Sequence, residues 1–148
     1  THAEVLLTLD EVAVLPAGHA LARKTVLEVA DFAEEKFVSL SADDPYRRLI
    51  DARFADAGVS RTLRVETHSA AAVCAMVEHG LGIAIVNPVT ALAATSERLV
   101  LRRLAFSIPF SVTALLPMYR PPLPEVAPML QALRAETAHI ARQLQGLA

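Results

Sequence analysis

The stretch that decides the fold is residues 66–88, which read ETHSAAAVCAMVEHGLGIAIVNP. Val73, Met76 and Val77 recur in it at helical spacing. Residues 81–86 are then almost continuously apolar, which is typical of a parallel strand that is covered on both faces. The stretch therefore predicts a strand end, a helix, a glycine turn and a buried strand, which together form a βαβ unit.

Polar side chains gather at the ends of three predicted strands, and small molecules bind to open parallel sheets beyond such ends. The first group follows the strand expected at residues 37–40, the second closes the strand expected at 63–67, and the third follows the strand at 81–86. We therefore expect a ligand site formed by Ser41, Asp43, Thr67, His68, Ser69 and Asn87.

Each of these residues also has a purely structural interpretation. Thr67 and Ser69 are good helix N-cap types, and so is Asp44, which precedes a proline at the first position of the next predicted helix. His68 can be a solvated residue at a helix start, and Asn87 before a proline can shape a turn. The shared location of the six residues supports the prediction more than any single one of them.

Tests for catalytic, metal and nucleotide motifs are negative. Gly80-Leu-Gly82 precedes a strand instead of linking a strand to a helix, so we interpret it as a turn and not as a dinucleotide fingerprint. The five histidines show no close pairing that would place two imidazoles on one metal. Ser69 and His68 are not a catalytic pair, because adjacent side chains diverge and no Gly-x-Ser-x-Gly turn surrounds the serine. We expect neither an enzyme, nor a metal, nor a cofactor.

The composition is that of an ordinary globular domain. The chain has 148 residues, 53% hydrophobic and 20% charged, with no apolar run long enough to span a membrane. Its formal net charge of -2 gives no overall attraction for a polyanion, so this segment alone should not hold duplex DNA. Cys74 is the single cysteine and is expected on a buried helix face. No signal segment opens the sequence, and we expect a cytoplasmic location.

The other elements are predicted from periodicity and turn signals. Two short strands within residues 4–15 break at Asp10-Glu11, and a helix begins after Asp44 and ends at Gly58. That helix should bury Tyr46, Leu49, Ile50 and Phe54 and should direct Arg47, Arg48, Asp51, Arg53 and Asp56 outward. Further elements are a helical turn at 29–33, a helix at 89–94, strands at 99–101 and 110–116, a proline break at 121–124 and a long closing helix.

Four runs resemble the effector-binding part of LysR-type transcriptional regulators, namely residues 9–22, 38–47, 66–77 and 82–91. The Gly-Leu-Gly-Ile motif is common to the whole family, whereas ETHSAA together with VCAM is much narrower. The resemblance extends from Leu6 to the proline segment near Pro121. It implies an α/β fold of two Rossmann-like subdomains, as in type 2 periplasmic binding proteins, with a ligand cleft.

By this resemblance, residues 17–109 form subdomain two, and residues 1–16 and 110–148 form part of subdomain one. The winged helix-turn-helix, the linker helix and the first strands of subdomain one have no counterpart in the sequence, so one cleft wall is expected to be missing. The implied function is co-inducer sensing by a homo-oligomeric regulator that reaches promoter DNA through the absent domain. The narrower motif implies control of lysine biosynthesis, with diaminopimelate as inducer and lysine opposing it.

A solute-binding protein of a transport system has the same architecture and is the alternative function. The residues upstream of Thr1 separate the two hypotheses. A helix-turn-helix favours the regulator, and a secretory peptide favours the transport protein.

Overall fold

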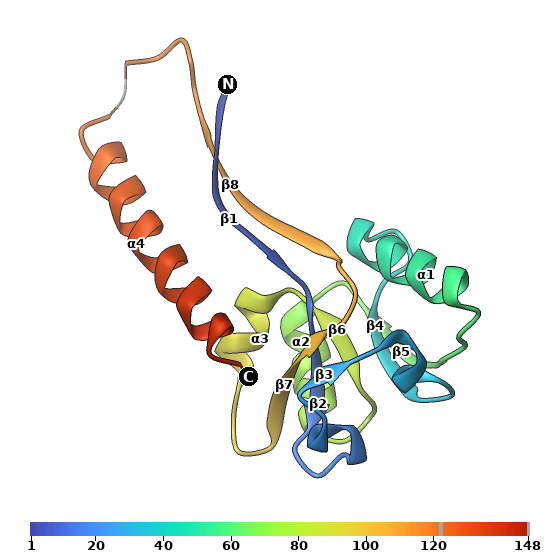
Figure 1. Ribbon diagram of the computed structural model, residues 1–148. Coiled ribbons are helices and arrows are strands. Elements are labelled where there is room, and N and C mark those ends of the chain that lie inside the picture. The colour runs from blue at the N-terminus through green and yellow to red at the C-terminus, as the bar shows by residue number, and fades with distance from the viewer. Residues whose placement is uncertain (122, 148) are drawn as a thin grey trace. The chain divides into compact units, whose positions relative to one another are not determined.

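The buried strand predicted in residues 81–86 is present as β6 (Ala84–Val86), and all of its residues are buried. The computed structural model describes residues 1–121 and 123–147 and divides into two units (Figure 1). Asp10–Ile108 form the larger unit around β6, and Thr1–Leu9 with Pro109–Gly146 form the smaller one. Pro122, within the predicted proline break, and Ala148 lie outside the described residues.

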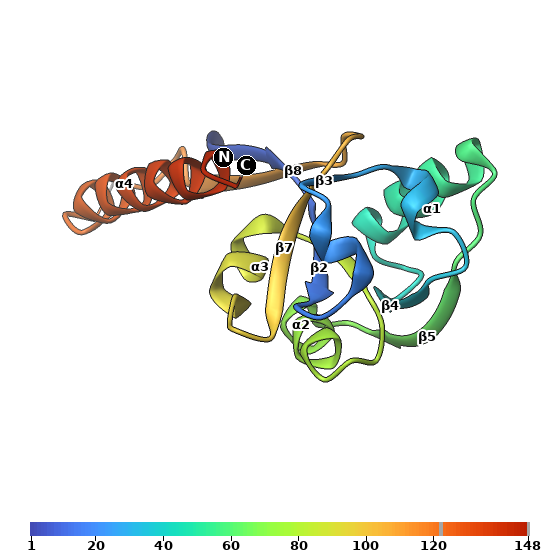
Figure 2. The ribbon, with the colours of Figure 1, turned by 60° about the horizontal axis from the view of Figure 1, so that its bottom comes forward.

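The larger unit alternates strands with helices. Its strands are β2 (Val12–Pro16), β3 (Val26–Leu27), β4 (Lys36–Leu40), β5 (Thr62–Thr67), β6 and β7 (Leu99–Leu104). Its helices are α1 (Pro45–Ala57), α2 (Ala70–Glu78) and α3 (Pro88–Ala94), with short 3₁₀ helices η1 (Ala20–Arg23) and η2 (Val29–Phe32). Figures 1 and 2 show α1 and α3 on opposite sides of β2. The predicted α/β class and the predicted strand–helix–strand unit are confirmed.

The strands of the larger unit form a four-stranded sheet and a two-stranded sheet, which one isolated bridge links. β3, β7, β2 and β6 lie side by side in this order, with β2 antiparallel to both of its neighbours, and β4 pairs in parallel with β5. A parallel bridge between Phe37 and Ile83 joins β4 to the chain entering β6. The Ile83 N–H donates to the Lys36 carbonyl at 2.8 Å, and the Val38 N–H donates to the Ile83 carbonyl at 2.9 Å. The carboxyl ends of β5, β4 and β6 therefore meet at one edge.

Gly82 permits this close approach of two backbones. A Cβ atom at Gly82 would lie 2.4 Å from the Lys36 carbonyl oxygen and 2.9 Å from its carbonyl carbon. Gly80 has a φ of 80° in the left-handed region, where a side chain is strained. The Gly80-Leu-Gly82 motif is therefore a turn that ends α2 and admits β6 beside β4, as predicted.

The core on the α1 face is built on aromatic rings. Phe32, Phe37 and Phe54 pack edge to face, with ring centroids 5.5 to 6.2 Å apart. The Arg61 guanidinium lies 4.3 Å from the Phe54 centroid and 4.7 Å from the Phe37 centroid, and it pairs with Asp51. A cation over aromatic faces is attracted by the ring quadrupole, so this buried arginine is part of the core.

Helix α1 begins as predicted but is rotated about its axis relative to the prediction. Asp44 is its N-cap, and Gly58 closes it in the left-handed conformation. Its buried residues are Arg47, Ile50 and Phe54. Leu49 was expected inside and is 46% exposed.

The outward orientation predicted for Arg47 is wrong, because this residue is only 5% exposed. It donates to the Leu40 carbonyl at 2.8 Å, to Glu66 Oε1 at 3.0 Å and to the Asp51 carboxylate at 2.9 Å. A buried guanidinium is tolerated when acceptors satisfy its donors. Arg47 thus ties the start of α1 to the ends of β4 and β5.

The smaller unit consists of the strand pair β1 (His2–Asp10) and β8 (Pro109–Leu116) and of α4 (Val126–Gln145). Arg134 of α4 binds Glu4 of β1 through two hydrogen bonds of 2.6 and 2.8 Å. Strand β2 belongs to the larger unit, where it lies between β6 and β7 and its residues 12–15 are buried. Among the described residues no helix is both long and apolar enough to cross a membrane.

Replacing Gly82 with alanine should destabilise the larger unit by about 1 to 3 kcal/mol, because the new methyl group overlaps the backbone of Lys36. Urea unfolding of the purified protein measures this loss. Gly18→Ala is the matched control, since no atom lies within 4 Å of a Cβ at that position. Equal urea midpoints for the two variants would show that the close approach of Gly82 to the Lys36 backbone does not contribute to stability.

Candidate functional site

Backbone pairing brings the carboxyl ends of β5, β4 and β6 and the start of β2 to the same edge of the sheet. We call the residues at this edge the strand-end row. The pairing of β4 with β5 places Ser41 opposite His68, and the parallel bridge between Phe37 and Ile83 makes Asn87 the position of β6 that corresponds in register to Ser41 of β4. The antiparallel pairing of β2 with β6 adds Glu11 beside Asn87. These residues therefore belong to the same edge of the sheet, in which paired neighbouring strands lie about 4.8 Å apart.

Ser41, Asp43 and His68 come together at one end of this row. Ser41 Oγ lies 2.7 Å from His68 Nδ1, and Asp43 Oδ1 lies 3.9 Å from the same nitrogen. The hydrogen bond from the Ser41 hydroxyl lowers the pKa of the Asp43 carboxyl, so this group is a carboxylate at neutral pH. The side chains of His68 and Asp43 are 82% and 74% exposed, which leaves both open to a ligand.

Thr67, Ser69 and Asn87 all accept a backbone hydrogen bond. Ser69 Oγ accepts from Ala72 N–H at 3.2 Å, which confirms the N-cap interpretation of Ser69. Asn87 Oδ1 accepts from Thr90 N–H at 2.8 Å, so Asn87 is the N-cap of α3, where the sequence suggested only a turn. Thr67 Oγ1 accepts from Ser69 N–H at 3.4 Å. A capping hydroxyl keeps its own proton to donate, and so does the amide group of Asn87. Their binding of a ligand stays a prediction.

Glu11 is a residue of this edge that the sequence analysis missed. It is 1% exposed, and neither carboxylate oxygen has a hydrogen-bond partner among the described residues. Burial, with a smaller effect of the Asp44 carboxylate, raises the pKa of Glu11 to about 8. The sequence signal was an acidic pair inside an apolar run, which we interpreted only as a break between strands.

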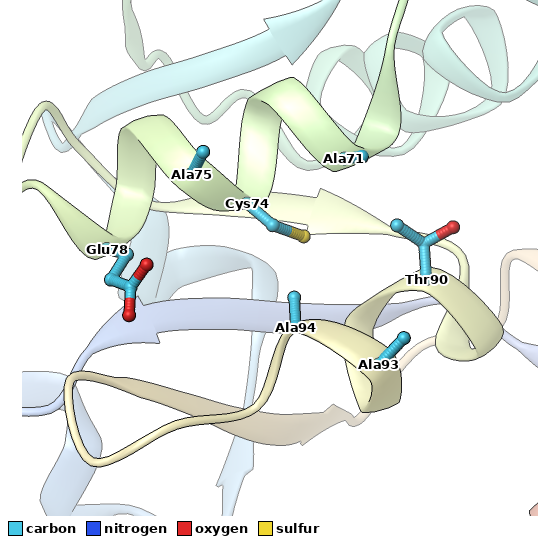
Figure 3. A pocket seen from close by; sticks show the side chains of 7 residues that line it. All are labelled: Ala71, Cys74, Ala75, Glu78, Thr90, Ala93 and Ala94. Carbon is cyan, nitrogen blue, oxygen red and sulfur yellow. The ribbon is translucent and has the colours of Figure 1, made fainter.

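A hollow lies between α2 and α3 and has a volume of about 290 Å³ (Figure 3). Its lining is mostly methyl groups, and its residues are Ala71, Cys74, Ala75, Glu78, Thr90, Ala93 and Ala94. Glu78 already accepts a hydrogen bond from Ser96 at 2.7 Å, and burial raises the pKa of the Cys74 thiol, which makes it unreactive. None of the predicted site residues lines this hollow, so the strand-end row is the better candidate for a charged ligand.

The described residues also bear on metal binding. Within residues 1–121 and 123–147, no group of three or more His, Cys, Asp or Glu side chains is placed to hold a metal ion. The polar atoms of the row are hydroxyl, amide, imidazole and carboxylate groups, which suit hydrogen bonding to a small polar molecule.

This α/β architecture is that of the type 2 periplasmic-binding-protein-like fold. The regulatory domain of CcmR from Synechocystis, solved in complex with 2-PG, matches 92% of this chain and 66% of its own, with a TM-score of 0.73 at 19% identity. The model of the LysR substrate binding domain matches residues 1–138. The chain belongs to this LysR family.

Two curated relatives are regulatory proteins. The transcriptional activator protein LysR of Escherichia coli (strain K12) is 53% identical over 116 residues, which make up 78% of this chain and 37% of the relative. The regulatory protein NocR of Agrobacterium tumefaciens (strain T37) is 31% identical over 128 residues, or 84% of this chain and 43% of the relative. The chain thus spans less than half the length of either protein. Both names are those of regulatory proteins.

Glu11 should make stability depend on pH. Its folded pKa of about 8 lies above the ordinary 4.5, so between these values the folded protein holds a proton that the unfolded chain has released. The free energy of unfolding should therefore fall as pH rises through this window, by up to about 1.4 kcal/mol per pH unit, and level off above it.

Glu11→Gln removes this titration, so the variant should match the parent at the acidic end and become the more stable protein at the alkaline end. Urea unfolding across the window measures the difference. Asp10→Asn is the control, because it removes an exposed carboxylate at the adjacent position. A difference between variant and parent that stays constant with pH would contradict the assignment.

Proposed function

We propose that this chain is the co-inducer-sensing domain of a DNA-binding transcription regulator that controls lysine biosynthesis, with diaminopimelate as inducer and lysine opposing it. The observation that carries the proposal is the 53% identity to the activator LysR. The narrow ETHSAA motif of the sequence lies at the candidate site, because its residues 66–71 comprise the end of β5 and the start of α2. The segment most specific to this resemblance is therefore also the segment that meets the proposed ligand.

The chemistry of the row matches an amino acid with charges at both ends. Diaminopimelate has a carboxylate and an ammonium group at each end. The amides that open α2, with the hydroxyls of Thr67 and Ser69, suit a carboxylate, and the helix dipole adds to this. Asp43 suits an ammonium group, whereas Asp44 Oδ1 is engaged by the backbone amides of Tyr46 and Arg47. Ser41 and Asn87 serve either charge, and His68 holds Ser41 in place.

The two units support a division of the effector domain. The larger unit, Asp10–Ile108, corresponds in this proposal to subdomain two, and the smaller unit to part of subdomain one. The regulator acts in the cytoplasm as a homo-oligomer, because a twofold protein suits an operator with two half-sites. Contact with promoter DNA then belongs to a separate DNA-binding domain.

The solute-binding alternative shares this architecture, so the fold alone does not separate the two functions. The curated relatives are regulators, which favours the first. The sequence upstream of Thr1 is the direct discriminator, as a helix-turn-helix or a secretory peptide would be found there.

The full-length protein should bind the promoter of the diaminopimelate decarboxylase gene and activate it when diaminopimelate is added, with lysine reducing the response. The isolated chain should show no specific binding, because its net charge of -2 opposes contact with phosphate. Gel shifts with competitor DNA and a transcription assay test both statements. A full-length protein that ignores this promoter, or an isolated chain that binds it specifically, refutes the proposal.

Thr67→Val and Asp43→Asn should each weaken diaminopimelate binding about tenfold to a hundredfold, the effect of losing one charge-assisted hydrogen bond. Titration calorimetry on the full-length protein measures this. Arg53→Ala, an exposed position on α1, is the control and should bind as the parent does. If both site variants fold and keep the parent's affinity, the ligand lies elsewhere.

A further inference from the structure

Glu11 combines deep burial with unused hydrogen-bonding capacity. Its side chain is 1% exposed, and both of its oxygens are without a hydrogen-bond partner among the described residues. None of the ion pairs found within those residues includes it. Buried polar groups in native proteins almost always have partners, so an exception requires an explanation.

The direction of the Glu11 side chain follows from strand alternation. Residues 11, 13 and 15 share one face of β2, and Ala13 and Leu15 pack in the cluster that contains Ile50 and Phe54 of α1. Glu11 therefore lies on the α1 face, at the end of β2 that adjoins Asn87. The electrostatic effect of Asp44, the N-cap of α1, on Glu11 is consistent with this position.

The charges around Glu11 favour a cation. Asp44 adds a second carboxylate, while the row neighbours Asn87 and Ser41 are neutral, and His68 stands at the far end of the row. Arg47, the buried cation of α1, is already bound to Leu40, Asp51 and Glu66. The described residues hold no cluster of ligands for a metal ion. The chemical class that fits is an organic ammonium group.

We propose that the Glu11 carboxylate binds the ammonium group of the effector and thereby selects amino compounds over plain dicarboxylates. This inference rests on the proposed function, because it places the effector at the same strand-end edge. It adds a residue at the opposite end of the row from Asp43, so the row offers one acceptor for an ammonium group at each end.

Binding of the ammonium group includes the transfer of a proton from Glu11 to solvent. Near neutral pH the buried group is mainly the neutral acid. When the ammonium group arrives, the O–H bond of Glu11 breaks, the proton passes to solvent, and the carboxylate accepts hydrogen bonds from the ammonium group. Up to one proton is released for each ligand bound.

The test is titration calorimetry on the full-length protein with meso-diaminopimelate, L-lysine and pimelate. Pimelate has the carbon chain and both carboxylates of diaminopimelate without its ammonium groups, so it is the matched ligand control. Glu11→Gln should bind diaminopimelate or lysine about tenfold to a hundredfold more weakly, with any pimelate affinity unchanged. Asp10→Asn, which removes the exposed carboxylate next in the chain, should bind as the parent does.

A second measurement needs no variant. Titrations of the parent in buffers with different heats of ionisation should show proton release with the amino compounds and none with pimelate. Parent-like affinity in a folded Glu11→Gln variant, the absence of proton release, or a parent that binds neither amino compound each overturns the assignment. Promoter activation is scored separately, so an amino ligand that binds through Glu11 without affecting transcription refutes the proposed function and leaves this inference standing.

Discussion

The larger unit depends on one contact between two backbones. Where Gly82 passes Lys36, no space exists for a side chain, and the two hydrogen bonds of 2.8 and 2.9 Å that follow join the parallel pair β4 and β5 to the rest of the sheet. This joint fixes the register of β6 against β4. Three strands consequently end at the same edge, and each is followed within a few residues by a helix N-cap, namely Asp44, Ser69 and Asn87. The polar edge is therefore a result of sheet geometry.

Two buried ionisable residues near this edge differ in whether hydrogen bonds satisfy them. Arg47 is satisfied by a carbonyl and two carboxylates, so its burial strengthens the attachment of α1 to the sheet. Glu11 has no such compensation among the described residues and stays neutral over much of the physiological pH range. A satisfied charge contributes to a rigid frame, whereas an unsatisfied one retains its full capacity to interact. Arg47 thus contributes to the rigid attachment of α1, whereas Glu11 is the residue that remains able to form new hydrogen bonds.

The sequence predicts the features of the fold that local chemistry determines. Asp44 before Pro45, the apolar run of β6 and the glycines after α2 each act within a few residues, and each was placed correctly. The rotation of α1 was not predictable from periodicity, because it depends on the Leu40 carbonyl and on Glu66, which lie on other elements. Likewise, the pairing of β2 brings Glu11 to Asn87, and no local pattern encodes that pairing. Six polar residues could be nominated from the sequence, but their order along one edge required the register.

Cys74 gives the protein an internal reporter. It is the chain's only cysteine, it is 2% exposed, and it lies on α2, the helix whose first turn carries Ser69. Because Cys74 is nearly buried at the hollow between α2 and α3, a thiol reagent reaches its sulfur faster when these helices move apart, so the labelling rate reports their local opening. A molecule held at the start of α2 stabilises the closed helix and slows labelling by the fraction of sites it occupies. Occupancy of the site can thus be followed in the unmodified chain, without an added probe.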